Sequence, residues 1–193
     1  KNIICDGKPV VISIASQIEI RQFDHQLDVS EKEENIVNKL WLEEIKKNPS
    51  LFNGRVANYC RHRILPNDDL VIDCAIVEYK YALAQMRDRC LKLTNPIGVS
   101  GVVIDQRGKF LLGKRSEQVS EYKGYFEFVP SGGISVQNLS GTMYFEQIKT
   151  ELVEETGIGP QNVKEMMPFC LIFDKNHGVY DIGVKVILSS GID

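Results

Sequence analysis

Residues 150–158 have the sequence Thr-Glu-Leu-Val-Glu-Glu-Thr-Gly-Ile, which is the most specific pattern in the chain. Its glutamates, Glu151, Glu154 and Glu155, are spaced i, i+3 and i+4, so an α-helix would place them on one face. Carboxylates this close repel one another, whereas Mg²⁺ favours oxygen ligands and turns the repulsion into binding. The pattern therefore predicts a metal-binding helix, although most glutamate-rich helix faces are simply solvated.

The position of these glutamates in the chain strengthens the prediction. We expect the helix to run from residue 139 to residue 156, with Gly157 as its C-cap, because glycine tolerates the left-handed conformation. Upstream, a short strand is predicted at residues 125–129, followed by a Pro-Ser-Gly-Gly turn at residues 130–133. Glycines let the backbone approach an ion closely, so a glycine turn ahead of an acidic helix favours an ion site.

The surrounding sequence predicts a β-rich domain. Apolar runs at residues 97–104 and 109–113 flank an Asp-Gln-Arg-Gly turn and predict a β-hairpin. Two further strands are predicted at residues 163–173 and 180–188. The preceding Asn95-Pro96 is a plausible joint between domains.

Three polar residues follow the predicted hairpin. Arg115 presents a planar guanidinium suited to phosphate oxygens, which makes it the best candidate for binding a diphosphate. A surface charge at a strand end is an equally common role for such an arginine. Lys114 and Gln118 are weaker candidates for contacts with the same ligand.

The first 94 residues predict a small α/β region without any chemical motif. Two short strands around Asp6-Gly7 come first, and a helix is predicted from residue 30 to residue 47. Ser30 and Glu33 are spaced as a capping box at its start. Strands at 55–65 and 70–77 and a helix at 79–90 complete the region. We therefore expect an N-terminal α/β region at 1–94 and a second domain at 95–193.

The composition is that of an ordinary globular protein, with 43% hydrophobic and 25% charged residues and a net charge of −3. This balance gives no reason to expect nucleic-acid binding, which usually needs a basic face. Five cysteines without a C-x-x-C pair indicate reduced thiols, and no stretch approaches the roughly 20 apolar residues of a membrane span. We expect an intracellular, cytoplasmic protein with a small-molecule ligand, and the oligomeric state stays open.

The stretch at 150–158 resembles the Nudix box, the motif of the Nudix hydrolase superfamily, whose pattern is G-x5-E-x7-R-E-U-x-E-E-x-G-U with U aliphatic. Eight of the nine positions fit, and Thr150 stands in place of the arginine. Residues 129–133 are similar to the lead-in of the box, and residues 98–115 to the first hairpin. The resemblance implies an α+β fold, a Nudix-type α/β/α sandwich with a mixed sheet, behind the N-terminal α/β region.

The resemblance also implies roles for individual residues. Glu151 would bind metal and serve as base, Glu155 and Glu154 would be further ligands, and the Gly132 carbonyl would complete the set. The implied cofactor is Mg²⁺, with Mn²⁺ as the alternative, and Arg115 would contact the substrate's phosphates. Such a cation neutralises phosphate charge and positions water for attack on phosphorus.

The chain departs from the Nudix pattern in three ways. The loop between Gly133 and Glu151 is about three residues longer than the pattern has it. Counted back from Thr150, the first glutamate of the pattern falls on Thr142, which is not acidic. In the family the arginine orients the neighbouring glutamate, and Thr150 cannot do this through a charge. These departures put the rate, and activity itself, in question.

Several other stretches resemble one branch, the UDP-glucose diphosphatases of animals and related eukaryotes. They are residues 40–54, 79–81, 95–99 and 114–119, so that the whole resemblance covers roughly residues 35 to 190. This branch has an N-terminal α/β region and a degenerate Nudix box of its own. The resemblance implies hydrolysis of UDP-glucose or UDP-galactose to UMP and a sugar 1-phosphate.

The sequence is compatible with three other interpretations. The chain could be a Nudix-fold binding or regulatory module without catalysis, a hydrolase of ADP-ribose-like compounds, or an unrelated α/β scaffold protein, which we rank last. The predicted domain at 95–193 is also short for the Nudix fold. Either a C-terminal part of it lies beyond Asp193, or the domain is unusual.

Overall fold

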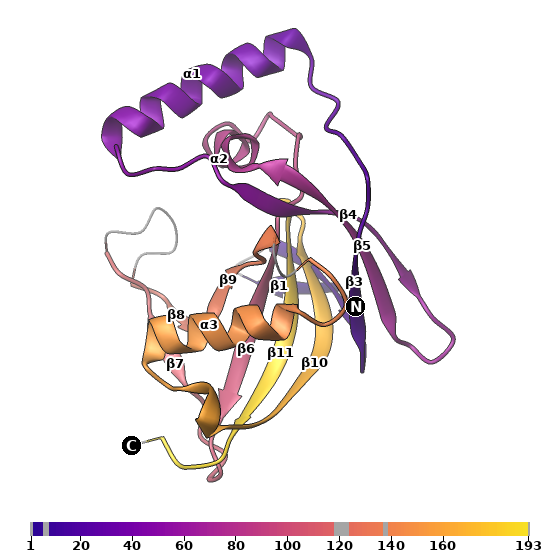
Figure 1. Ribbon diagram of the computed structural model, residues 1–193, viewed down its shortest axis with the longest axis vertical. Helices are drawn as coiled ribbons and strands as arrows, with labels where there is room; N and C mark the ends of the chain where they lie inside the picture. The colour runs from indigo at the N-terminus through magenta and orange to yellow at the C-terminus, as the bar shows by residue number, and fades with distance from the viewer. Residues whose placement is uncertain (1, 6–7, 118–123, 137–138, 193) are drawn as a thin grey trace.

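The computed structural model describes residues 2–5, 8–117, 124–136 and 139–192, and Figure 1 shows their arrangement. The chain is a mixed α+β protein, which confirms the coarse fold class. Its elements are, in order, β1 (Asn2–Cys5), β2 (Lys8–Ile14), β3 (Ile18–Gln22), α1 (Glu31–Lys47), β4 (Arg55–Ile64), β5 (Leu70–Glu78), α2 (Tyr79–Arg87), β6 (Ile97–Ile104), β7 (Leu112–Lys114), β8 (Phe126–Phe128), β9 (Ser131–Gly133), α3 (Tyr144–Thr156), the 3-10 helix η2 (Pro160–Asn162), β10 (Val163–Asp174) and β11 (Val179–Leu188).

The strands form three sheets. The largest has the order β1-β2-β10-β11-β6-β9 and is mixed, because β11 and β6 run parallel while its other neighbours run antiparallel. A second sheet has the order β3-β5-β4, and β7 pairs with β8 in a third. Helix α3 lies across one face of the largest sheet, and α1 and α2 lie together beside the second sheet (Figure 1).

The N-terminal region is joined to the rest of the chain by strand pairing and by a shared core. Strand β2 pairs with β10, so the first hairpin belongs to the six-stranded sheet. Isolated bridges connect Ile20 with Gly141 and Val56 with Ser135. One cluster of buried side chains contains residues of β3, β5, β6, α3 and β11. Packing against one core therefore fixes the position of α3.

The predicted capping box of α1 is confirmed. The Ser30 hydroxyl accepts a hydrogen bond from the Glu33 amide at 3.3 Å, and the Glu33 carboxylate accepts one from the Ser30 amide at 2.9 Å. Helix α1 packs on α2 through buried Val37 and Ala84. None of the helices in the described residues is long and apolar enough to cross a membrane.

The predicted hairpin of residues 97–104 and 109–113 is wrong in its second strand. Strand β6 has the expected bounds, but β7 begins only at Leu112 and pairs with β8. Next to the turn, Phe110 forms a bridge to Ile104 and the Leu111 amide donates to the Val103 carbonyl at 3.1 Å. The physical reason why the pairing goes no further is that β9 occupies this edge of β6 from Gly98 to Ser100, while β11 occupies the other edge.

The predicted start of α3 at residue 139 is also wrong, because the helix begins at Tyr144. The backbone of Gly141 instead exchanges hydrogen bonds with Ile20 of β3, at 2.7 and 2.8 Å, and has a φ of 55°. Neither β3 nor β9 was expected, and residues 131–133, predicted as part of a turn, form the edge strand β9. Tertiary pairing here overrides local preference. The predicted C-cap is confirmed, since Gly157 is left-handed with a φ of 73°.

The shared core predicts that the chain unfolds as one cooperative unit. We expect Ile72→Ala in β5 and Ile148→Ala in α3, both at fully buried positions, each to lower the free energy of unfolding by about 2–5 kcal/mol. Urea denaturation should show both losses in the same single transition. As a control, Val153→Ala at a position that is 44% exposed should change it by less than about 0.5 kcal/mol. Two separate transitions, each sensitive to one variant, would contradict a shared core.

A buried carboxyl group lies inside the six-stranded sheet, on β11. Asp181 pairs with Gly98 of β6, and its Oδ1 atom is buried without a hydrogen-bond partner among the described residues. Burial raises the pKa of the Asp181 carboxyl to about 7, and a hydrogen bond with the Ser100 side chain only partly offsets this effect. Between pH 3.8 and about pH 7, the Asp181 carboxyl therefore stays protonated in the folded protein, whereas it is ionised in the unfolded chain.

This raised pKa predicts how stability depends on pH. Between the ordinary pKa of 3.8 and about 7, the folded state binds more protons than the unfolded state, so Asp181 makes the protein less stable as the pH rises. We expect Asp181→Asn to gain stability relative to the parent protein by about 1 kcal/mol for each pH unit in this range. Urea denaturation at pH 4, 5.5 and 7 measures the trend, and Asp24→Asn at an exposed position is the control. A stability difference between Asp181→Asn and the parent protein that stays constant across this pH range would contradict the raised pKa of Asp181.

Candidate functional site

Helix α3 presents its glutamates to the glycine strand β9. The buried side of the helix, formed by Tyr144, Ile148 and Leu152, packs into the core, and this fixes the direction in which the neighbouring glutamates point. Glu151 is half-buried, whereas Glu154 and Glu155 are exposed. The predicted helical spacing is confirmed, but the three carboxylates have different surroundings.

Glu151 lies directly against Gly132. A Cβ added at Gly132 would overlap the carboxylate of Glu151 and would lie 3.0 Å from its Cγ. Any side chain at position 132 would therefore push Glu151 away. The glycine is required here because of this close approach, and its φ is not left-handed.

Glu155 also reaches β9, one helical turn further along α3. Its Oε2 accepts a hydrogen bond from the Ser131 amide at 3.2 Å. Although the residue as a whole is exposed, partial burial of its carboxyl group raises the pKa of Glu155. The Ser131 amide counteracts this, and the nearby charges of Glu151 and Glu127 raise the pKa further. The two carboxylates thus share one electrostatic environment beside the β9 backbone.

Glu154 is not brought to this position. It is exposed on α3, and it makes no hydrogen bond or ion pair within the part of the chain that the structure describes. The carbonyl oxygen of Gly132 faces β6, where it lies 2.9 Å from the place of a Gly98 Cβ. The four expected ligands therefore do not converge equally, and Glu151 and Glu155 form the centre of the site.

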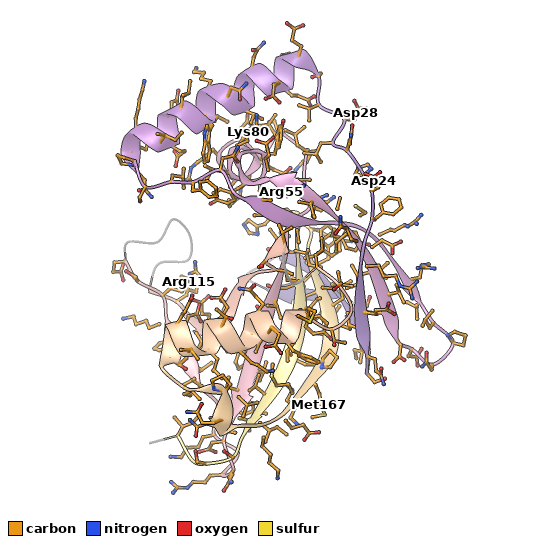
Figure 2. The ribbon with its side chains drawn as sticks, viewed as in Figure 1. Asp24, Asp28, Arg55, Lys80, Arg115 and Met167 are labelled. Carbon is orange, nitrogen blue, oxygen red and sulfur yellow. The ribbon has the colours of Figure 1, made fainter. Side chains whose placement is uncertain are left out.

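Arg115 lies beside the carboxylates and is paired with an acid. Its Nη1 donates a hydrogen bond to Glu127 Oε2 at 2.6 Å, and both side chains are half-buried, with exposures of 27% and 32%. Figure 2 shows Arg115 between the end of β7 and α3. The charges of both residues influence the pKa of the Glu155 carboxyl, Glu127 raising it and Arg115 lowering it. The cluster therefore consists of three carboxylates and one guanidinium.

Glu127 is a residue of this cluster that no sequence pattern indicated. On β8 it lies between Phe126 and Phe128, and because side chains alternate along a strand, it points away from the face of these exposed rings. A lone acid between two aromatic residues was the available signal. Only the pairing of β7 with β8 places it next to Arg115.

Among the described residues, the other positions singled out in the sequence are not brought into this cluster. Lys114 is exposed and lies opposite Phe126 in the β7–β8 register, so strand alternation directs it away from Arg115. Gln118 lies outside the described residues. Thr142 precedes α3 and lines a hollow with residues of β3 and β5, away from β9.

A single cation could be held by this cluster. Within residues 2–5, 8–117, 124–136 and 139–192 no group of three or more His, Cys, Asp or Glu side chains converges as a metal site. Mg²⁺, however, is commonly bound by only one or two carboxylates, with water and substrate phosphates completing its shell. Glu151 and Glu155 supply two such hard oxygen donors, so the residues present fit this ion.

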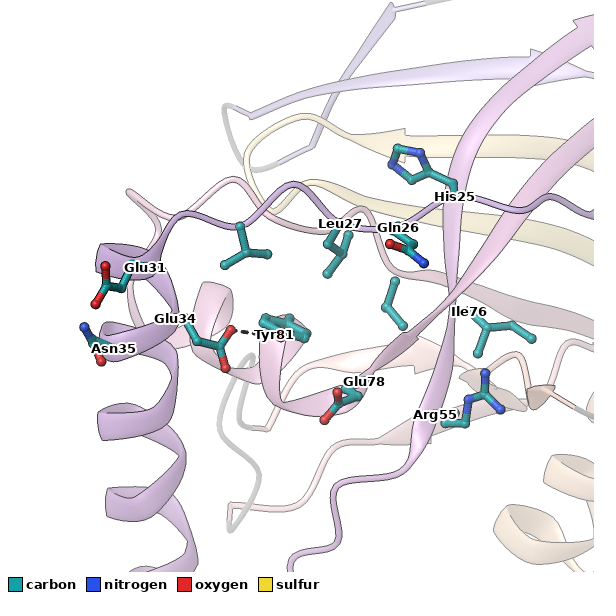
Figure 3. Close-up of a pocket in the computed structure, with 12 residues that line it drawn as sticks. His25, Gln26, Leu27, Glu31, Glu34, Asn35, Arg55, Ile76, Glu78 and Tyr81 are labelled. Atoms are coloured by element: carbon teal, nitrogen blue, oxygen red, sulfur yellow. Dashed lines mark hydrogen bonds between the residues drawn. The ribbon is translucent and has the colours of Figure 1, made fainter.

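A hollow beside the N-terminal helices is a separate feature. It has a volume of about 820 Å³ and lies between residues 25–29, α1, α2, β5 and the start of β4, with Tyr81 and Glu34 hydrogen-bonded at 2.9 Å within it (Figure 3). None of the expected site residues lines it. A second bond, from Lys80 to Glu34 at 2.7 Å, indicates that these polar groups hold α1 and α2 together.

Comparisons with known proteins add no family assignment, because no family model and no curated protein matches the chain.

The close approach at Gly132 can be tested by two adjacent substitutions. In Gly132→Ala the Glu151 carboxylate has to move and gives up its hydrogen bond from Gln147, which should cost about 0.5–1.5 kcal/mol. Gly133→Ala is the matched control, since nothing lies within 4 Å of its added Cβ. Urea denaturation gives the stabilities, and crystal structures of both variants give the Glu151 positions. An unmoved Glu151 in Gly132→Ala would refute this geometry.

Proposed function

We propose that this chain is a Nudix-type pyrophosphohydrolase that uses Mg²⁺ to hydrolyse the diphosphate bond of a nucleoside-diphosphate sugar. The observation that carries the proposal is the approach of Glu151 and Glu155 to β9, at Gly132 and Ser131, with the Arg115–Glu127 pair beside them. Three carboxylates and a guanidinium suit a ligand that carries phosphates and a divalent cation.

Glu151 and Glu155 would hold the ion. Burial is the main cause that raises the pKa of Glu155, and the negative charges of Glu151 and Glu127 raise it further. A cation bound between the carboxylates would neutralise these charges. When bound, Mg²⁺ supplies positive charge to the phosphates and activates water. A phosphate group of the substrate would supply further oxygen ligands to the ion.

Arg115 would bind the diphosphate. Its planar guanidinium can donate two parallel hydrogen bonds to phosphate oxygens. In the structure one nitrogen donates to Glu127, which keeps the guanidinium directed into the cluster. Glu127 therefore acts as a positioning residue for Arg115.

The reaction breaks one P–O bond of the diphosphate bridge. Water attacks one phosphorus atom, a carboxylate of the Glu151–Glu155 pair accepts the proton of the water, and the bridging oxygen leaves with the other phosphoryl group. The products are a nucleoside monophosphate and a sugar 1-phosphate. Fixed charges placed around the phosphates account for most of the rate in reactions of this kind.

The proposed substrates are UDP-glucose and UDP-galactose. Their support is the resemblance of residues 40–54, 79–81 and 95–99 to UDP-glucose diphosphatases. ADP-ribose-like compounds carry the same diphosphate, so the site itself does not distinguish them.

A second candidate function is nucleotide binding without turnover. It is favoured because, among the described residues, no three His, Cys, Asp or Glu side chains are placed to hold one metal ion, and the third carboxylate of the cluster, Glu127, is paired with Arg115. Thr142 and Thr150, which replace the glutamate and the arginine of the Nudix pattern, point in the same direction.

Hydrolysis can be tested with Mg²⁺ and a panel of UDP-glucose, UDP-galactose, ADP-ribose and ADP-glucose, by measuring released nucleoside monophosphate. We expect selective release of UMP. Glu151→Gln and Glu155→Gln should each lower kcat/KM by about 100-fold or more, because each removes a charge from the centre of the site. Glu154→Gln, at the exposed position, should lower it by less than about tenfold.

Two outcomes would overturn parts of this proposal. If the Glu151→Gln/Glu155→Gln double variant is active, these two carboxylates are not the catalytic site. No release from any compound, together with nucleotide binding measured by calorimetry, would establish the second candidate function instead.

A further inference from the structure

A buried glutamine precedes Glu151 by one helical turn. Gln147 is 9% exposed, and its Nε2 donates a hydrogen bond to Glu151 Oε1 at 2.7 Å. Its Oε1 accepts a hydrogen bond from the Ser135 amide at 3.1 Å. The side-chain amide thus connects the loop after β9 with the carboxylate at the centre of the site.

The Ser135 bond fixes which end of the amide faces Glu151. A backbone N–H can only donate, so the Gln147 oxygen has to face Ser135 and the NH₂ group has to face Glu151. Gln147 therefore offers Glu151 a donor in a fixed direction. The carboxylate is held over Gly132, where a side chain would displace it.

Thr150, directly before Glu151, does not contribute to this arrangement. It is exposed, and its hydroxyl donates to the Glu146 carbonyl of its own helix at 3.0 Å. Among the described side chains, Gln147 is the one that donates a hydrogen bond to the Glu151 carboxylate. Because an amide is neutral, this bond leaves the full negative charge of Glu151 available to a cation.

The N-terminal region takes part in this arrangement. Val56 of β4 forms an antiparallel bridge with Ser135, whose amide binds Gln147. The connection from β4 to Glu151 therefore runs through one bridge and two hydrogen bonds. Through these contacts the N-terminal region helps to hold the Glu151 carboxylate in place.

We propose that Gln147 is the positioning residue of the carboxylate site, and that it holds Glu151 in the direction a divalent cation requires while Ser135 and β4 anchor it. This inference rests on the proposed function of Glu151 as a cation ligand. Hydrogen-bond partners of metal ligands set ligand orientation, and their loss typically weakens metal binding 10- to 100-fold.

The test compares two buried glutamines of the full chain. Gln147→Met keeps the volume and removes both hydrogen bonds. Gln85→Met is the matched control, because Gln85 is 7% exposed and exchanges bonds of 2.7 and 3.0 Å with the Thr94 backbone in the N-terminal region. Mn²⁺ binding, followed by electron paramagnetic resonance of the free ion, is measured for the parent protein, both variants and Glu151→Gln. Thermal melting shows whether the two methionine variants lose similar stability.

We expect the dissociation constant for Mn²⁺ to rise about 10- to 100-fold in Gln147→Met and to stay unchanged in Gln85→Met. In the hydrolysis assay, Gln147→Met should need more Mg²⁺ for half-maximal activity and should recover its kcat at saturating Mg²⁺. A general loss of structure would not recover in this way.

Two results would overturn the inference, and they are distinguishable. If Gln147→Met binds Mn²⁺ as tightly as the parent protein while Glu151→Gln does not, Gln147 has no positioning role and the proposed function stands. If Glu151→Gln binds Mn²⁺ like the parent protein, the proposed role of Glu151 fails, and the inference fails with it.

Discussion

The contact between β9 and α3 at Gly132 is the constraint on which the candidate site depends. Because Gly132 has no side chain, the Glu151 carboxylate lies against the backbone of an edge strand, and Glu155 reaches the Ser131 amide one turn later. Strand β9 is held in turn by β6, and α3 by its buried Tyr144, Ile148 and Leu152. Two rigid elements thus bring two carboxylates together, and sites built on such elements are more exactly positioned than sites on loops.

The N-terminal region is part of the same architecture. Its first hairpin extends the six-stranded sheet, and its strands β3 and β4 bridge to Gly141 and Ser135 on either side of the segment that leads into α3. The Tyr59 ring of β4 stacks on the Tyr180 ring of β11 with centroids 3.6 Å apart. A region without chemical motifs therefore determines where α3 begins and how the loop before it is held.

Charge in the site is arranged unequally. Glu127 neutralises Arg115, whereas Glu151 is oriented by the neutral amide of Gln147 and Glu155 by a backbone amide. Negative charge consequently remains at the two carboxylates, next to a guanidinium that is already oriented. A ligand combining a cation with phosphates would satisfy both halves of this arrangement, which is why a diphosphate substrate is the proposal that the geometry supports best.

The sequence by itself determined the features that depend on neighbours in the chain. Helical spacing placed the glutamates on one face, Gly157 ended α3, and Ser30 with Glu33 began α1. Only the tertiary structure decided that Glu151 and Glu155, but not Glu154, contact β9, and that Glu127 and Gln147 belong to the site. It also decided that α3 begins at Tyr144 instead of residue 139, and that β7 pairs with β8 instead of β6. The physical reason is that these features arise from pairing between strands far apart in sequence, and local periodicity carries no information about the register or edge at which such strands meet.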